Sequence, residues 1–152
     1  MELTVDTRSA AQIDAEALVT YLFDQEKPDS GVLAQLDQAA GGALSKLSAS
    51  GELTGKTLET TLLYFPQGLA AQRLLIVGAG KKEKFGAAEL RRLAGAVVRA
   101  LKSRQVKRVA FLVRESDRSA AAAQAVVEGI ILANYDSEKY KTDKKPGNEI
   151  TA

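Results

Sequence analysis

A glycine-rich turn with adjacent lysines is the strongest candidate for chemistry in this sequence. Gly78-Ala79-Gly80 directly follows an apolar run, and Lys81-Lys82 come next. Glycines at the end of a buried strand let backbone N–H groups approach a phosphate. The dinucleotide-binding fingerprint, however, requires a third glycine where Glu83 stands and an acidic residue about 20 positions further on, which Val97–Arg99 do not supply. The turn therefore favours a structural strand-to-loop connection, with a phosphate-binding loop as the alternative.

Carboxylates, lysines and tyrosines are the other groups that could do chemistry. Paired carboxylates can hold a divalent cation or share a proton. All three pairs flank predicted strands, in loops where exposed acids are common, so we interpret each as solvated surface. A lysine serves as a reactive amine only when it is desolvated. We interpret Lys81, Lys82 and Lys84, in the loop after Gly80, as solvent-exposed. The pairs are Asp14/Glu16, Asp24/Glu26 and Glu115/Asp117.

The residue types that are absent exclude several function classes. The chain has 152 residues and contains no Cys, no His and no Trp. These absences exclude a zinc site built on Cys or His, a thiol nucleophile and a histidine-based catalytic triad. The first residues lack the basic start and apolar run of a signal peptide, and no apolar stretch approaches the ~18 residues of a membrane span. We predict no catalytic, cofactor-binding or metal-binding residue in this chain.

Charge is spread unevenly along a chain whose formal net charge is +2. Residues 1–72 carry 4 basic and 10 acidic side chains, whereas residues 73–118 carry 13 basic and 4 acidic ones. A basic segment can attract nucleic acid or an acidic protein surface. Only Phe85 and Phe111 are interleaved with these cations, fewer aromatic residues than single-strand readers usually require, so a solvated helix face is the favoured interpretation.

The hydrophobic patterning predicts alternating strands and helices. Continuous apolar or Thr-rich runs predict strands at 17–23, 57–64, 73–77 and 108–113, and Leu3 and Val5 suggest a short edge strand. Helical spacing predicts helices over 32–47, 90–101 and 120–135. Gly41-Gly42 weakens the first helix, and a close packing neighbour would explain both glycines. The order implies one α/β domain with three layers, α/β/α, around a mixed, mainly parallel sheet in which strands 57–64 and 73–77 pair antiparallel.

Two stretches resemble a known family. The first is the run 75–85 (LIVGAGKKEKF) followed by 88–95 (AELRRLAG), and the second is 127–135 (VEGIILANY) followed by 139–142 (KYKT). Both resemble the N-terminal domain of the leucyl (cytosol) aminopeptidase family, in order along the whole chain. That resemblance implies a macro-domain-like fold followed by a catalytic domain that binds two divalent metal ions, Mn or Zn. It also implies a cytoplasmic hexamer whose N-terminal domains lie on the outside.

On that resemblance, residues 1–135 form the N-terminal domain and residues 136–152 a tail leading to the catalytic domain. The expected function is a non-catalytic accessory domain for assembly or substrate access, with its own catalytic domain and further subunits as partners. The parent enzyme would release N-terminal residues from peptides, away from any membrane. Two alternatives remain: binding of an ADP-ribose-like nucleotide through Gly78–Gly80, and binding of nucleic acid through the basic segment 73–118.

Overall fold

Four strands form one sheet in the order β2-β3-β1-β4. The computed structural model describes residues 8–139, with the backbone alone at residue 116 and at residues 135–139. Strand β1 runs parallel to both β3 and β4, whereas β2 runs antiparallel to β3. The predicted mixed, mainly parallel sheet is therefore confirmed. The strands are β1 (Ala17–Phe23), β2 (Thr60–Tyr64), β3 (Arg73–Gly80) and β4 (Val109–Phe111).

Strand β1 is central because its residues suit burial on both faces. All seven are buried, as expected of an apolar run inside a parallel sheet. The one polar member of the buried set, Thr20, donates its hydroxyl to the Leu112 carbonyl oxygen at 3.0 Å. This bond satisfies the hydroxyl and extends the contact between β1 and the chain leaving β4.

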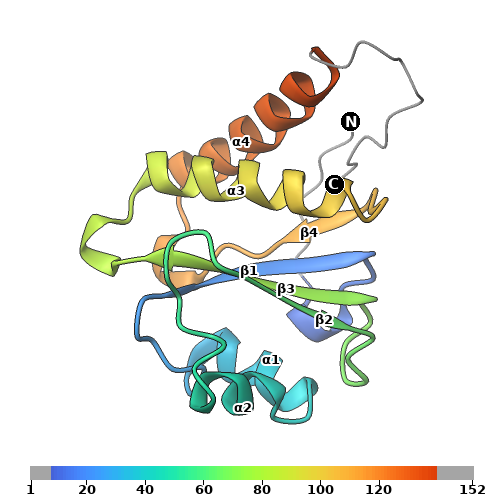
Figure 1. Cartoon of the computed structure of the whole chain (residues 1–152), viewed down its shortest axis with the longest axis vertical. Helices are drawn as coiled ribbons and strands as arrows, with labels where there is room; N and C mark the ends of the chain where they lie inside the picture. Colours follow the sequence, from blue (N-terminus) through green and yellow to red (C-terminus); the bar gives the residue numbers. More distant parts are fainter. Residues whose placement is uncertain (1–7, 140–152) are drawn as a thin grey trace.

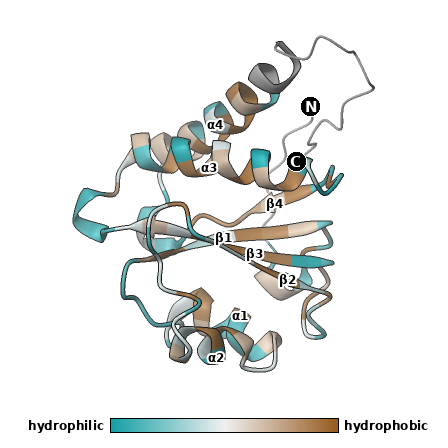
Figure 2. Ribbon diagram, viewed as in Figure 1, coloured by the Kyte–Doolittle hydropathy of each residue, from teal (hydrophilic) through white to brown (hydrophobic). Residues whose placement is uncertain are grey.

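Helices cover both faces of the sheet, so the predicted three layers are confirmed (Figure 1). On one face, α1 (Gly31–Ala39) and α2 (Ala43–Ala49) supply Leu33, Leu36 and Leu44 to a core shared with Leu18 and Leu22. On the other face lie α3 (Ala87–Lys102) and α4 (Ala120–Lys139). The hydrophobic surfaces of the strands and helices meet between the layers (Figure 2).

The single helix predicted over 32–47 is two helices, and the glycines explain why. Gly41 and Gly42 have φ angles of +69° and +82°, in the left-handed region that ends a right-handed helix. The proposed close neighbour is wrong, because a Cβ at either glycine would meet nothing within 4 Å. Asp37 then accepts the Ser45 backbone N–H at 3.0 Å and so caps α2.

A close crossing joins α3 to α4. A Cβ on Gly129 would lie 2.3 Å from the Arg91 carbonyl oxygen, so only glycine permits this helix spacing. Beside the crossing, Arg91 Nε donates to the Glu128 carboxylate at 2.8 Å. The two helices consequently form one layer over the sheet.

Several boundaries differ from the prediction. Strand β3 continues through Gly80, because the residues of the predicted turn remain hydrogen-bonded to their neighbours. Helix α4 continues to Lys139, because polar residues are compatible with a helix beyond the part that packs against the fold. Strand β4 is shorter than the predicted 108–113. The edge strand predicted at Leu3 and Val5 lies outside the described residues. No helix in the described part of the chain is long and apolar enough to cross a membrane.

Candidate functional site

A cavity of about 410 Å³ opens at the carboxyl ends of β1 and β3, where α/β proteins commonly bind ligands. The chain segments that meet there are the 55–58 loop, the end of β3 and the first turns of α3. The lining residues are Asp24, Lys56, Thr57, Leu58, Gly78, Ala79, Gly80, Lys81, Lys84, Glu89, Arg92 and Leu93. The structure thus places the candidate glycines beside a cavity.

The glycines of this turn are required by close backbone approach. A Cβ on Gly78 would lie 1.7 Å from the Lys56 carbonyl oxygen, far inside contact distance. Gly80 has a φ of +75°, and a Cβ there would lie 2.5 Å from the Thr57 hydroxyl oxygen. Gly55 faces Phe23 in the same way, with a φ of +82° and a Cβ position 2.1 Å from that carbonyl oxygen. Packing of the 55–58 loop onto the sheet accounts for all three glycines.

The amides of Gly78 and Gly80 already have partners inside the fold. Gly78 N donates to the Glu59 carbonyl oxygen at 2.7 Å, and Gly80 N donates to the Gly55 carbonyl oxygen at 3.0 Å. A phosphate-binding loop needs such N–H groups to point at the ligand. In this conformation these two amides do not point at one.

The loop over the glycines is held in place by a carboxylate. Glu59 accepts the Thr54 backbone N–H at 2.9 Å and the Thr54 hydroxyl at 2.8 Å. The backbone hydrogen bond from Thr54 is the main cause that lowers the pKa of the Glu59 carboxyl below its ordinary value. Glu59 therefore stays ionised and closes the 54–59 segment into a unit.

Cations outnumber acids around the cavity. Lys56, Lys81, Lys84 and Arg92 contribute positive charge, against Asp24 and Glu89. The Glu89 carboxylate is engaged in capping α3, since it accepts the Gly86 N–H at 2.9 Å. The excess of positive charge at the cavity favours small anions. A lysine acts as a nucleophile only where it is desolvated, and Lys56, Lys81 and Lys84 are exposed.

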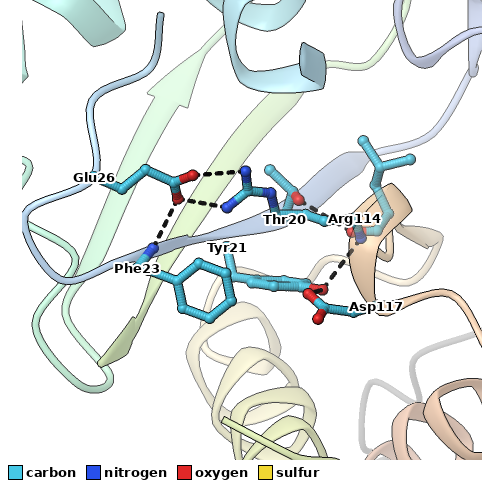
Figure 3. Close-up of polar contacts among 7 residues, drawn as sticks. Thr20, Tyr21, Phe23, Glu26, Arg114 and Asp117 are labelled. Carbon is cyan, nitrogen blue, oxygen red and sulfur yellow. Dashed lines mark hydrogen bonds and ion pairs between the residues drawn. The ribbon is translucent and has the colours of Figure 1, made fainter. Parts of the chain in front are cut away.

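A second polar cluster, which the sequence interpretation missed, lies beside the cavity end of β1 (Figure 3). The Tyr21 hydroxyl donates to the Asp117 carboxylate at 2.6 Å and accepts the Arg114 backbone N–H at 3.2 Å. The Arg114 guanidinium binds both oxygens of Glu26, at 2.5 and 2.7 Å, and Glu26 also accepts the Phe23 N–H. The cluster ties the 113–118 segment to the centre of the sheet.

Aromatic rings pack around the cluster. The ring of Tyr21 stacks on Phe85 with centroids 5.2 Å apart, and Phe23 meets Phe85 edge-on at 5.1 Å. The Arg114 guanidinium lies 5.4 Å from the centroid of the Phe23 ring. Tyr21 stands inside an apolar run, and a buried tyrosine needs a hydrogen-bond partner for its hydroxyl. The sequence therefore signals that a partner exists. The partner is 96 positions away, so local patterning could not identify it.

These contacts correct the interpretation as solvated surface for one member of each carboxylate pair, whereas Asp14 and Glu115 are exposed as predicted. Glu26 and Asp117 bind Arg114 and Tyr21 within the fold. Glu16 accepts the Lys107 N–H at 2.6 Å, and that bond is the main cause that lowers the pKa of its carboxyl. Asp14 does lie in an exposed pair, 3.8 Å from the Arg108 guanidinium. Among the described residues, no group of three or more Asp or Glu side chains is placed so that it could hold a metal ion.

Burial is the main cause that raises the pKa of the Tyr21 hydroxyl well above its ordinary value, and the hydrogen bond to Asp117 is the second. The unfolded chain releases this proton near its ordinary pKa of about 10, whereas the fold retains it. Stability from Tyr21 is therefore complete below about pH 10 and is lost as the pH rises above it. Urea unfolding should be measured at a series of pH values from neutral to strongly alkaline. The free energy of unfolding should fall more steeply with rising pH for the wild-type chain than for Tyr21→Phe.

Tyr64→Phe is the matched control, because the Tyr64 ring is 57% exposed. Its alkaline stability profile should follow that of the wild-type chain. Identical slopes for wild type and Tyr21→Phe would contradict the assigned role of the Tyr21 hydroxyl.

Much of the basic segment 73–118 is used within the fold. Arg91, Arg108 and Arg114 pair with acidic side chains, and Arg73 donates to the Glu16 carbonyl oxygen at 3.2 Å. Other cations of the segment, such as Arg92 and Arg99, are exposed on α3. The arrangement fits the favoured interpretation of a solvated helix face more closely than a continuous nucleic-acid groove.

The family model that matches this chain and its curated relatives name the same family. Residues 18–144 match the model of the cytosol aminopeptidase family, N-terminal domain. A probable cytosol aminopeptidase of Solibacter usitatus is 40% identical over 149 residues, which cover 98% of this chain and 28% of that protein. Its counterpart from Koribacter versatilis is 35% identical over 164 residues, with 95% of this chain and 32% of that protein covered. The chain therefore spans about a third of the length of these curated relatives.

Solved structures share the fold. A mutant of tomato leucine aminopeptidase superposes with a TM-score of 0.68 at 22% identity, covering 97% of this chain and 30% of that one. The macrodomain of Mycobacterium tuberculosis DarG superposes with a TM-score of 0.64 at 15% identity, covering 99% of this chain and 93% of that one. These likenesses confirm the macro-domain-like fold. The match over residues 18–144 shows that the chain belongs to the cytosol aminopeptidase family, as its N-terminal domain.

Proposed function

We propose that this chain is the non-catalytic accessory domain of a larger leucyl-type metallo-aminopeptidase. The observation that carries the proposal is the family match over residues 18–144 in a chain about one third as long as its curated relatives. Residues 1–135 would form the domain and residues 136–152 the connection to the catalytic part. The candidate cavity supports a non-catalytic role, because its glycine amides and its Glu89 carboxylate are engaged in structural hydrogen bonds.

We extend the proposal to the parent enzyme, with the family match as its support. The catalytic part would bind two divalent metal ions, Mn or Zn, and release N-terminal residues from peptides. The whole protein would be a cytoplasmic hexamer in which this domain contributes to assembly or to substrate access. Its partners would be its own catalytic domain and the neighbouring subunits.

The test compares this chain with the longer polypeptide of its parent gene. The longer chain, supplied with manganese or zinc, should hydrolyse leucine anilide, and chelation should abolish that hydrolysis. The 152-residue chain should show no turnover under either condition. Robust hydrolysis by the short chain, or none by the longer chain with either metal, would overturn the proposal.

Nucleotide binding is the competing function, and one observation favours it: the excess of cations around the cavity. One structural neighbour is a Trypanosoma brucei macrodomain in complex with ADP-ribose, at 14% identity, a likeness that concerns the fold alone. The hydrogen bonds that occupy Gly78 N and Gly80 N speak against a diphosphate loop here. We therefore favour the accessory role.

A further inference from the structure

Helix α4 carries apolar side chains on its outer side as well as on its packed side. Its inner side chains, among them Val126, Ile130 and Ala133, are buried against the rest of the α3–α4 layer. On the outer side, Ile131 is 44% exposed and Leu132 is 53% exposed. Large apolar side chains that are exposed on the same part of a surface are candidates for contact with another element. The outer side of α4 is therefore short of a covering element within the described residues.

Three apolar side chains lie on the outer part of this helix: Val127 is half-buried, whereas Ile131 and Leu132 are exposed. Val127 and Ile131 are four residues apart and so lie one above the other on the helix. Leu132 is the next residue in sequence and points about 100° further round the helix. We call these three residues the α4 outer patch. Polar groups beside the patch are already paired: Glu128 accepts from Arg91 and from Gln124, both at 2.8 Å. Because Glu128 is already paired with Arg91 and Gln124, covering it together with the patch costs less desolvation free energy than covering an unpaired carboxylate would.

We propose that the α4 outer patch docks against the part of the parent polypeptide that follows this domain. The proposal rests on the proposed function, in which a catalytic part follows. Helix α4 is the last element described, and its C-terminal end extends beyond α3 (Figure 1). Lys139 comes seven positions after Leu132, a rise of only about 10 Å along the helix. The following polypeptide is thus tethered beside the patch, which gives it a high effective concentration there.

The other exposed apolar residues lack this placement. Tyr64 and Phe65 are 57% and 69% exposed, but they lie where β2 ends, before the connection to β3. The guanidinium of Arg73 lies 6.0 Å from the centroid of the Tyr64 ring. These residues serve as a control, because they are at least as exposed as Ile131 and Leu132 and belong to a different part of the fold.

Cysteine labelling tests the docking directly, because the 152-residue chain contains no native cysteine. Ile131→Cys and Leu132→Cys are each introduced into this chain and into the longer parent chain, with Phe65→Cys as the control. Maleimide labelling is followed at each position by mass spectrometry of peptides, so cysteines elsewhere in the longer chain do not interfere. Positions 131 and 132 should label about tenfold more slowly in the longer chain, whereas position 65 should label equally fast in both.

Each outcome bears on the proposal separately from the proposed function. Equal labelling of positions 131 and 132 in both chains would overturn the docking, as would selective slowing at position 65. Slowing that already occurs in the short chain, and increases with its concentration, would instead assign the patch to a second copy. Hydrolysis of leucine anilide by the same longer chain decides the proposed function: activity with unprotected positions 131 and 132 would remove the docking alone.

Discussion

Gly78→Ala should cost at least about 3 kcal/mol of unfolding free energy, at the upper end of the usual range for overpacking. The added Cβ would lie 1.7 Å from the Lys56 carbonyl oxygen, and that oxygen belongs to backbone that cannot rotate aside. Relief requires the 55–58 loop to lift, which strains the bond from Gly78 N to Glu59 and the bond from Leu58 N to the Gly78 carbonyl oxygen. Thermal and urea unfolding followed by circular dichroism would measure the loss.

Gly86→Ala is the control for this substitution. Gly86 has an extended backbone, with φ −153°, and a Cβ there would meet only the flexible Glu89 carboxylate at 3.3 Å. Its unfolding free energy should stay within about 1 kcal/mol of the wild-type value. Equal stabilities for the two alanine variants would show that the 55–58 loop is not packed as described.

Arg114→Met should cost about 2 to 3 kcal/mol, because it leaves Glu26 without its guanidinium partner in a partly buried position. The side chains of Arg114 and Glu26 are only 14% and 26% exposed, so solvent replaces the lost bonds poorly. The same change removes the cation that lies over Phe23. Urea denaturation at neutral pH would measure the difference.

A double variant and an exposed pair complete this experiment. Arg114→Met combined with Glu26→Leu should recover part of the loss, since neither charge then stays unpaired. Arg108→Met breaks the exposed pair with Asp14, whose side chains are 54% and 70% exposed, and should cost no more than about 0.5 kcal/mol. A cost for Arg114→Met no larger than that for Arg108→Met would contradict the structural role of the cluster around Tyr21.

The elements themselves could be predicted where one type of periodicity dominates. The apolar run 17–23 is the buried central strand, and the spacing of Leu90, Leu93 and Val97 is the packed face of α3. Antiparallel pairing of β2 with β3 also followed from the short connection between them. These features depend on local sequence, which is why local reasoning suffices for them. The helix predicted over 32–47 was wrong at Gly41-Gly42, because helical spacing continued across two residues whose backbone is left-handed.

For the candidate site, the sequence indicates which residue types are unusual, but it does not indicate which groups they contact in the fold. Gly78 and Gly80 were correctly selected as special, but a glycine that permits a ligand and a glycine that permits a packed loop look the same in a sequence. The choice depends on Lys56, Thr57 and Glu59, which approach the turn only in the folded chain. The prediction of solvent exposure is wrong for Glu26 and Asp117 for the same reason: their partners, Arg114 and Tyr21, are distant along the chain.

The sequence by itself determined the α/β class, the absence of cysteine and histidine chemistry, and the family resemblance carried by the runs 75–95 and 127–142. Only the tertiary structure decided how the glycine amides are used, which carboxylates are structural, and which apolar residues of α4 remain uncovered. The physical reason is common to all three. Hydrogen bonding and burial are properties of pairs of groups, and the deciding partners lie as many as 96 positions apart, beyond the range over which sequence periodicity carries information.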